Sequence, residues 1–123
     1  GAPVTPRLIQ RETTMAGLTV SKPGKTVGSR IWSEKTCQTL TAMMANNVEK
    51  TYGQSNFGDL KICAKSGTAE VGTASPHSWF AGFLNDAAHP YAFVVLVENG
   101  GGGATVAGSI ASTVLQEAVK EAD

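Results

Sequence analysis

Hydrophobic residues recur with a helical period between residues 34 and 50. Four of them are spaced by three or four positions and therefore share one face of a helix: Cys37, Leu40, Met44 and Val48. Ser33 precedes the segment, and a serine hydroxyl there can accept a hydrogen bond from a free amide of the first turn. Gly53 and the polar residues after it end the pattern. We expect a helix over residues 34–50 whose apolar face packs on a sheet.

Three strand candidates follow, at residues 61–65, 78–84 and 91–97. The links between them carry glycine, proline, asparagine and aspartate, which favour turns. Links this short join antiparallel neighbours, so the three segments predict a meander. The third run, from Tyr91 to Val97, is apolar at every position instead of alternating, which predicts that both faces of its sheet are covered.

A second helix is predicted near the end of the chain, over residues 105–120. Its expected buried stripe consists of Val106, Ile110, Val114, Leu115 and Ala118. The glycine run Gly100–Gly103 precedes it and is expected to form a flexible turn. This run lacks the Gly-Lys-Ser/Thr ending with which a phosphate-binding loop reaches its ligand.

Residues 1–30 are rich in proline, glycine, threonine and serine. One β-like stretch lies at residues 8–11 and a turn signal at residues 21–25, which predict an entry strand followed by a loosely ordered hairpin. The expected fold class is α/β of the α+β type. In chain order it has a β-like N-terminal extension, a helix, a three-stranded antiparallel sheet over residues 61–97, and a C-terminal helix that covers the sheet with the first.

The composition narrows the function classes. The chain has 123 residues, with ten Lys plus Arg against ten Asp plus Glu. This size suits one compact domain, and the charge balance argues against nucleic acid or an anionic membrane surface as a partner. No apolar run approaches the roughly 20 residues that span a bilayer, so we expect this piece to be soluble. If a longer parent is exported or anchored, the responsible segment lies outside these residues.

Cys37 and Cys63 are the two cysteines. They are too few for a disulfide framework and lack the paired spacing of a zinc site, so we expect neither a metal nor another cofactor. Two half-buried free thiols are the favoured interpretation. A bridge between Cys37 and Cys63 stays open if the helix that carries one packs on the strand that carries the other.

The run Lys65-Ser66-Gly67-Thr68 carries the candidate chemistry. It supplies a cation, two hydroxyl groups and a glycine that lets a ligand approach the backbone closely. These groups suit a wall that holds a carboxylate and a reacting carbonyl group during serine acyl transfer. The run lies at the end of a predicted strand, and aromatic residues Trp79 and Phe80 follow on the adjacent one.

Three consecutive segments carry a family resemblance: residues 65–70 (Lys-Ser-Gly-Thr-Ala-Glu), 77–83 (His-Ser-Trp-Phe-Ala-Gly-Phe), and the apolar run from Pro90 into Asn99-Gly100-Gly101. These three segments and the terminal helix after them resemble the end of a penicillin-binding protein transpeptidase domain. The resemblance extends from about Pro6 to the C-terminus and is most specific in its centre. It implies a partial transpeptidase domain of the serine D,D-transpeptidase and β-lactamase-like superfamily.

The resemblance also implies roles for the motif, which is the third of three active-site elements in that family. Lys65 would orient and electrostatically support the serine hydroxyls of the other two elements. Ser66 and Thr68 would bind the carboxylate of a D-Ala-D-Ala stem peptide or of a β-lactam. The backbone amide of Thr68 would be one donor of the oxyanion hole. Gly67 would lack a side chain because the substrate backbone lies against the strand.

The sequence departs from the family because it contains neither Ser-x-x-Lys nor Ser-x-Asn. Without the nucleophile and its lysine no acyl-enzyme can form, so the resemblance implies a fragment that is inactive alone. Its partners would be peptidoglycan stem peptide, β-lactams and the remainder of the transpeptidase domain, in a parent anchored in a membrane with this domain on the extracytoplasmic face. The alternative is a non-catalytic α/β module that binds a carboxylate or a peptide.

In the family fold, the strand that corresponds to residues 91–97 pairs on its far side with a strand from the beginning of the domain. The resemblance therefore implies an unpaired apolar edge here. We expect this edge to favour a homodimer or aggregation through strand addition.

Overall fold

The computed structural model describes residues 1–122. Its contacts divide the chain into two compact units, Gly1–Gln38 and Thr39–Asp123, and each unit is described by itself. No helix of the described residues is both long and apolar enough to cross a membrane.

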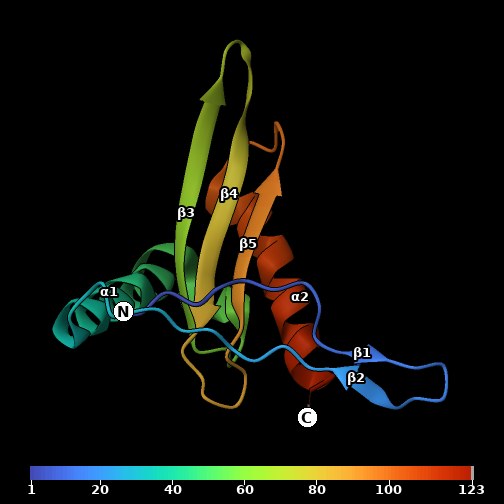
Figure 1. Cartoon of the computed structure of the whole chain (residues 1–123). Helices are drawn as coiled ribbons and strands as arrows, with labels where there is room; N and C mark the ends of the chain where they lie inside the picture. Colours follow the sequence, from blue (N-terminus) through green and yellow to red (C-terminus); the bar gives the residue numbers. More distant parts are fainter. Residues whose placement is uncertain (123) are drawn as a thin grey trace. The chain divides into compact units, whose positions relative to one another are not determined.

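The second unit contains a three-stranded antiparallel sheet in the order β3-β4-β5 (Figure 1). The strands are β3 (Ile62–Val71), β4 (Ala74–Leu84) and β5 (Ala92–Val97). The predicted meander is therefore confirmed, but β3 and β4 are longer than expected. The motif lies inside β3, not at its end, because Lys65–Thr68 pair in register with Ala81–Ser78 of β4.

Pro76 was expected in a loop but lies within β4. Proline cannot donate to a strand ladder, so it is tolerated where a neighbouring strand is missing. β5 ends at Val97, which pairs with Ser78, so β4 has no β5 partner at Pro76. Instead, the Pro76 carbonyl accepts a hydrogen bond from the Gly101 amide at 2.9 Å.

The first helix, α1 (Glu34–Asn47), begins as predicted, and the Thr36 amide donates to Ser33 Oγ at 3.1 Å. It continues into a π-helical segment, η1 (Val48–Gly53), and a 3-10 turn, η2 (Gln54–Phe57). The expected packing of its apolar face on the sheet holds only at the C-terminal end. Val48 is fully buried, whereas α1 has no buried residue and Leu40 is 40% exposed.

The core lies on one face of the sheet, which we call the covered face. Its buried residues from the sheet are Ile62, Ala64, Phe80 and Leu84, and those from the helical segments are Val48, Phe57, Ala107, Ala111 and Leu115. Phe80 lies at its centre, because three aromatic rings contact it. The ring centroids of Tyr52, Phe57 and Phe93 lie 5.3, 5.7 and 6.0 Å from that of Phe80. Figure 1 shows α2 behind the strands.

The opposite face carries large apolar side chains that stay exposed, and we call it the open face. Register places Trp79 opposite Leu96, and Ala81 opposite Val94, so these residues share a face. Trp79, Val94 and Leu96 are 38%, 64% and 43% exposed. The expectation that both faces of β5 are covered is therefore wrong for the described residues, in which β5 alternates between exposed and half-buried positions.

The C-terminal helix has a different buried stripe from the predicted one. A π-helical segment, η3 (Gly103–Ala107), leads into α2 (Gly108–Lys120), so helical structure starts two residues early. Leu115 is buried as expected, but Ile110 and Val114 are 43% and 58% exposed. Small residues, Ala107 and Ala111, take the positions against the sheet. They are favoured there because α2 approaches Phe80 closely: a Cβ on Gly108 would lie 3.6 Å from its ring.

The N-terminal unit has little regular structure. Strands β1 (Glu12–Thr13) and β2 (Thr19–Ser21) form an antiparallel pair, and an isolated bridge joins Val4 to Val27. A hairpin is present, but its turn lies between residues 13 and 19 and not at the predicted residues 21–25. Residues 8–11 form no strand, since Leu8 is fully exposed and no partner segment pairs with it among the described residues.

Candidate functional site

β3 brings Lys65, Ser66, Gly67 and Thr68 to an edge of the sheet. The backbone amide of Ser66 donates to the Tyr52 hydroxyl at 2.9 Å, so it points away from β4. In an antiparallel strand alternate residues direct their amides to the same side. Thr68, two residues on and without an intervening register shift, therefore also presents its amide to the outer edge. A ligand that runs along this edge can reach the Thr68 amide.

The side chains of the motif differ in their surroundings. Lys65 and Thr68 are exposed, whereas Ser66 is half-buried. The Lys65 ammonium donates to the Ser66 carbonyl oxygen at 2.6 Å. The Tyr52 hydroxyl donates to Ser66 Oγ at 3.1 Å, in addition to accepting from the Ser66 amide. The structure thus places the four predicted residues together and adds Tyr52.

Gly67 lies between two other segments of the chain. A Cβ on Gly67 would contact the Trp79 Cβ at 3.2 Å, which is tighter than ordinary van der Waals contact. On its other side the backbone of Gly103 packs directly on Gly67, and a Cβ on Gly103 would lie 3.0 Å from the Gly67 nitrogen and 2.8 Å from the Trp79 carbonyl oxygen. The fold itself therefore requires glycine at position 103, and at position 67 a Cβ fits only if Trp79 shifts by a few tenths of an ångström.

The glycine run is hydrogen-bonded to β4. Ser78 is fully buried, and its hydroxyl donates to the Gly102 carbonyl at 3.0 Å and accepts from the Ala107 amide at 3.0 Å. Ser78 pairs directly with Thr68. This contact joins the motif region to the start of the C-terminal helix through a buried hydroxyl group.

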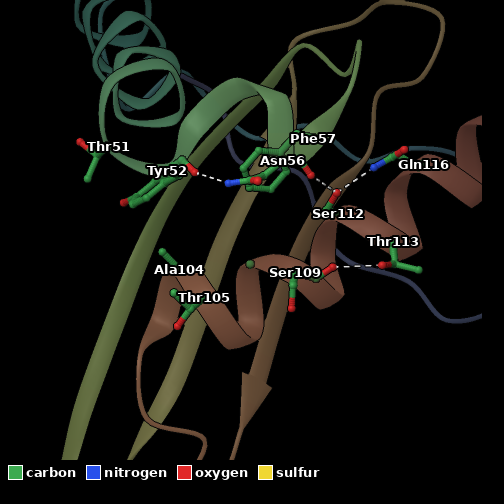
Figure 2. Close-up of a pocket in the computed structure, with 11 residues that line it drawn as sticks. Thr51, Tyr52, Asn56, Phe57, Ala104, Thr105, Ser109, Ser112, Thr113 and Gln116 are labelled. Atoms are coloured by element: carbon green, nitrogen blue, oxygen red, sulfur yellow. Dashed lines mark hydrogen bonds between the residues drawn. The ribbon is translucent and has the colours of Figure 1, made fainter.

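A cavity of about 560 Å³ lies between η1 and η2 on one side and η3 and α2 on the other (Figure 2). Eight of its eleven lining residues carry a hydroxyl or amide group: Thr51, Tyr52, Asn56, Thr105, Ser109, Ser112, Thr113 and Gln116. No charged side chain is among its lining residues, and the motif residues of β3 do not line it. A carboxylate at the motif would therefore lie outside this cavity, at the strand edge.

Both cysteines are free thiols, as expected; Cys37 is half-buried, but Cys63 is buried and not half-buried as predicted. Burial raises the pKa of the Cys63 thiol, so that group is a poor nucleophile at neutral pH. Within residues 1–122 no group of three or more histidine, cysteine, aspartate or glutamate side chains lies close enough to hold a metal ion.

Sequence reasoning missed Tyr52 and Ser78. Tyr52 lies 14 residues before its partner Ser66, and no short motif joins them. Ser78 sits beside two aromatic residues in a strand, where a serine gives no sign of a structural hydrogen bond. Only the pairing of β4 with β3 brings Ser78 next to Thr68.

Lys-Ser-Gly-Thr thus lies on an edge strand of an antiparallel sheet that a C-terminal helix covers, in the order that the sequence predicted. The chain matches the penicillin binding protein transpeptidase domain family over residues 1–116, and it belongs to this family. No curated protein matches the chain.

Solved structures agree with this assignment. The imipenem acyl-enzyme of penicillin-binding protein A from M. tuberculosis is 28% identical, with a TM-score of 0.81, over 97% of this chain and 27% of that one. The ceftriaxone acyl-enzyme of the same protein is 29% identical, with a TM-score of 0.80, over 94% and 28%. The D,D-transpeptidase domain of a peptidoglycan glycosyltransferase from Eggerthella lenta is 22% identical, with a TM-score of 0.80, over 98% of this chain and 28% of that one. At this identity it supports the fold alone. The chain spans less than a third of the length of these structures.

Proposed function

We propose that the chain is the C-terminal part of a transpeptidase domain from a peptidoglycan D,D-transpeptidase, and that it supplies the substrate-binding wall of the active site. The observation that carries this proposal is the placement of Lys65–Thr68 on an edge strand with the Thr68 amide directed outward. Membership of the family and the acyl-enzyme complexes of penicillin-binding protein A support it.

In this proposal each residue of the wall has one task. The Thr68 amide donates to the oxygen that becomes negative when a serine attacks the stem-peptide carbonyl. Ser66 and Thr68 bind the terminal carboxylate, and Lys65 provides positive charge for the serine hydroxyls of the other elements. The serine oxygen forms an ester with the acyl group while the terminal D-alanine leaves as an amine. An amine of a neighbouring stem peptide then attacks the ester and releases the serine.

The nucleophile of this reaction is not in the 123 residues, because the sequence contains no Ser-x-x-Lys and no Ser-x-Asn. We therefore expect this chain alone to form no acyl-enzyme. The parent would carry the missing elements and a membrane anchor that places the domain on the extracytoplasmic face.

Intact mass measurement after incubation with a fluorescent penicillin tests this function. The full-length protein should gain the mass of one penicillin, and this chain should gain none. A stoichiometric adduct on this chain would refute the missing nucleophile. Reversible binding of carboxylate peptides by a full-length protein that never forms the adduct would favour the non-catalytic binding module.

The outer edge of β5 is a second part of the proposal. Among the described elements β5 pairs with β4 only, which leaves its other edge open to a strand from the remainder of the domain or from a second copy. We expect the isolated chain to form dimers or larger species as its concentration rises, measured by sedimentation velocity. A monomer at all concentrations, with β5 capped by the chain's own N-terminal strand, would contradict this expectation.

A further inference from the structure

Tyr52 is bound to the motif through both functions of one hydroxyl group. It accepts a hydrogen bond from the Ser66 amide at 2.9 Å and donates one to Ser66 Oγ at 3.1 Å. We infer that Tyr52 is a positioning residue for carboxylate recognition: it directs the hydroxyl proton of Ser66 toward the ligand and ends the ligand groove at Ser66. This inference rests on the proposed function of the motif.

The proton count gives the direction of the Ser66 hydroxyl. Tyrosine has one hydroxyl proton, and in this contact that proton points to Ser66 Oγ. The proton of Ser66 therefore lies outside the contact and is available to an acceptor elsewhere. A hydroxyl that already accepts a hydrogen bond is polarised and becomes a better donor. A carboxylate at the strand edge would form the strongest hydrogen bond with such a donor, because it is negatively charged.

The position of Tyr52 is fixed from two sides. Its ring meets that of Phe80 edge-on at 5.3 Å, and its backbone carbonyl accepts from Asn56 Nδ2 at 2.7 Å. The Asn56 carbonyl in turn accepts from Ser112 Oγ of α2 at 2.6 Å, and Gln116 donates to that Oγ at 2.8 Å. Figure 2 shows these bonds from Tyr52 across to α2. The hydroxyl is thus held by the core and by the C-terminal helix before any ligand binds.

The same contact limits how far a ligand can pair with β3. The outward amides on this part of the edge belong to Ser66 and Thr68, and Tyr52 already uses that of Ser66. A peptide that adds to this edge can pair at Thr68 but finds the next amide occupied. The groove therefore suits a peptide ligand whose chain ends at Ser66 with a carboxylate. It disfavours a peptide whose chain continues past Ser66 along β3.

The test uses the full-length protein and the second-order rate of acylation by penicillin G, which carries a free carboxylate. Tyr52→Phe keeps the ring against Phe80 and removes only the hydroxyl. We expect it to slow acylation about tenfold, the effect of losing one oriented hydrogen bond. Tyr91→Phe is the matched control, because Tyr91 is also half-buried against the core and lies outside the motif. It should leave the rate unchanged.

Two further measurements separate positioning from structure. Ser66→Ala should slow acylation by a similar factor, and Tyr52→Phe added to Ser66→Ala should have no further effect, since both remove the same donor. The slowing by Tyr52→Phe should also disappear with the methyl ester of penicillin G. Effects of Tyr52→Phe and Ser66→Ala that multiply, or an equal slowing with acid and ester, would overturn the inference. A wild-type protein that penicillin G does not acylate would overturn the proposed function instead, and the inference with it.

Discussion

The two faces of the sheet carry the same kind of residue at neighbouring positions, yet only one face contributes a core. Phe80 is fully buried on the covered face, and Trp79, its neighbour in sequence, is 38% exposed on the open face. Val95 and Val94 differ in the same way on β5. An apolar residue therefore contributes to stability only where another segment packs on it. On the covered face those segments also hold the motif, through Tyr52 and Gly103.

The largest expected difference lies between Phe80→Ala and Trp79→Ala. Loss of the Phe80 ring leaves a cavity among Tyr52, Phe57 and Phe93, and should lower the free energy of unfolding by about 3–5 kcal/mol. Trp79→Ala should cost roughly 1 kcal/mol, because much of the side chain stays in water. Chemical denaturation of both variants measures the difference. Equal losses would show that the open face is covered in solution.

Ser78→Ala tests the polar contact that closes the covered face. It leaves the Gly102 carbonyl and the Ala107 amide without their buried partner, which should cost about 1–3 kcal/mol. Ser109→Ala is the matched control, since the Ser109 hydroxyl is exposed and donates to the nearby Val106 carbonyl of η3. The free energy of unfolding of that variant should equal that of the wild-type protein. A similar loss of unfolding free energy in both variants would contradict the structural role assigned to the Ser78 hydroxyl.

A smaller difference is expected between two valines of β5. Val95→Thr places a hydroxyl against the core and should cost about 1 kcal/mol. Val94→Thr, at a site that is 64% exposed, should change stability by less than about 0.5 kcal/mol. Thermal unfolding of the two variants decides the matter. If both are equally destabilised in the full-length protein but not in this chain, another segment covers the open face there.

Asp86, in the link between β4 and β5, belongs to neither face and should give the smallest effect. The Ala88 amide, and next the His89 side chain, lower the pKa of its carboxyl group from the ordinary value of 3.8. Its stabilising contribution is present above that value and is lost as the pH falls through the lower folded pKa. Asp86→Asn should unfold at a slightly lower temperature than wild type at neutral pH and at the same temperature in strong acid. A difference that grows on acidification would contradict this assignment.

Local patterns predicted the meander and the start of the first helix because they depend on neighbours in sequence. Turn residues between apolar runs gave the three strands, and Ser33 gave the N-cap of α1. The extent of β3 could not be predicted in this way. Its polar residues from Lys65 to Glu70 have no strand periodicity, and pairing with β4 is what extends them.

The phase of the C-terminal helix and the surroundings of the motif depend on contacts between distant segments. Close packing of Gly103 on Gly67 fixes where η3 starts, so Ala107 and Ala111 face the sheet, with Ile110 and Val114 left outside. Hydrophobicity alone favoured the larger residues. The four motif residues could be found by their chemistry, but Tyr52 could not, because its contact with Ser66 spans 14 residues.

The contact between Gly67 and Gly103 has a consequence for how the protein can vary. Two side chains in contact can change together, because a larger residue on one side is offset by a smaller one on the other. A side chain at position 103 would instead meet the backbones of Gly67 and Trp79, which no substitution makes smaller, so this position has no compensating partner. In a library randomised at both positions and selected for folding, glycine should be recovered at position 103 more strictly than at position 67. The edge strand that carries Lys65–Thr68 therefore rests on a backbone contact at Gly103 that side-chain substitution cannot relax.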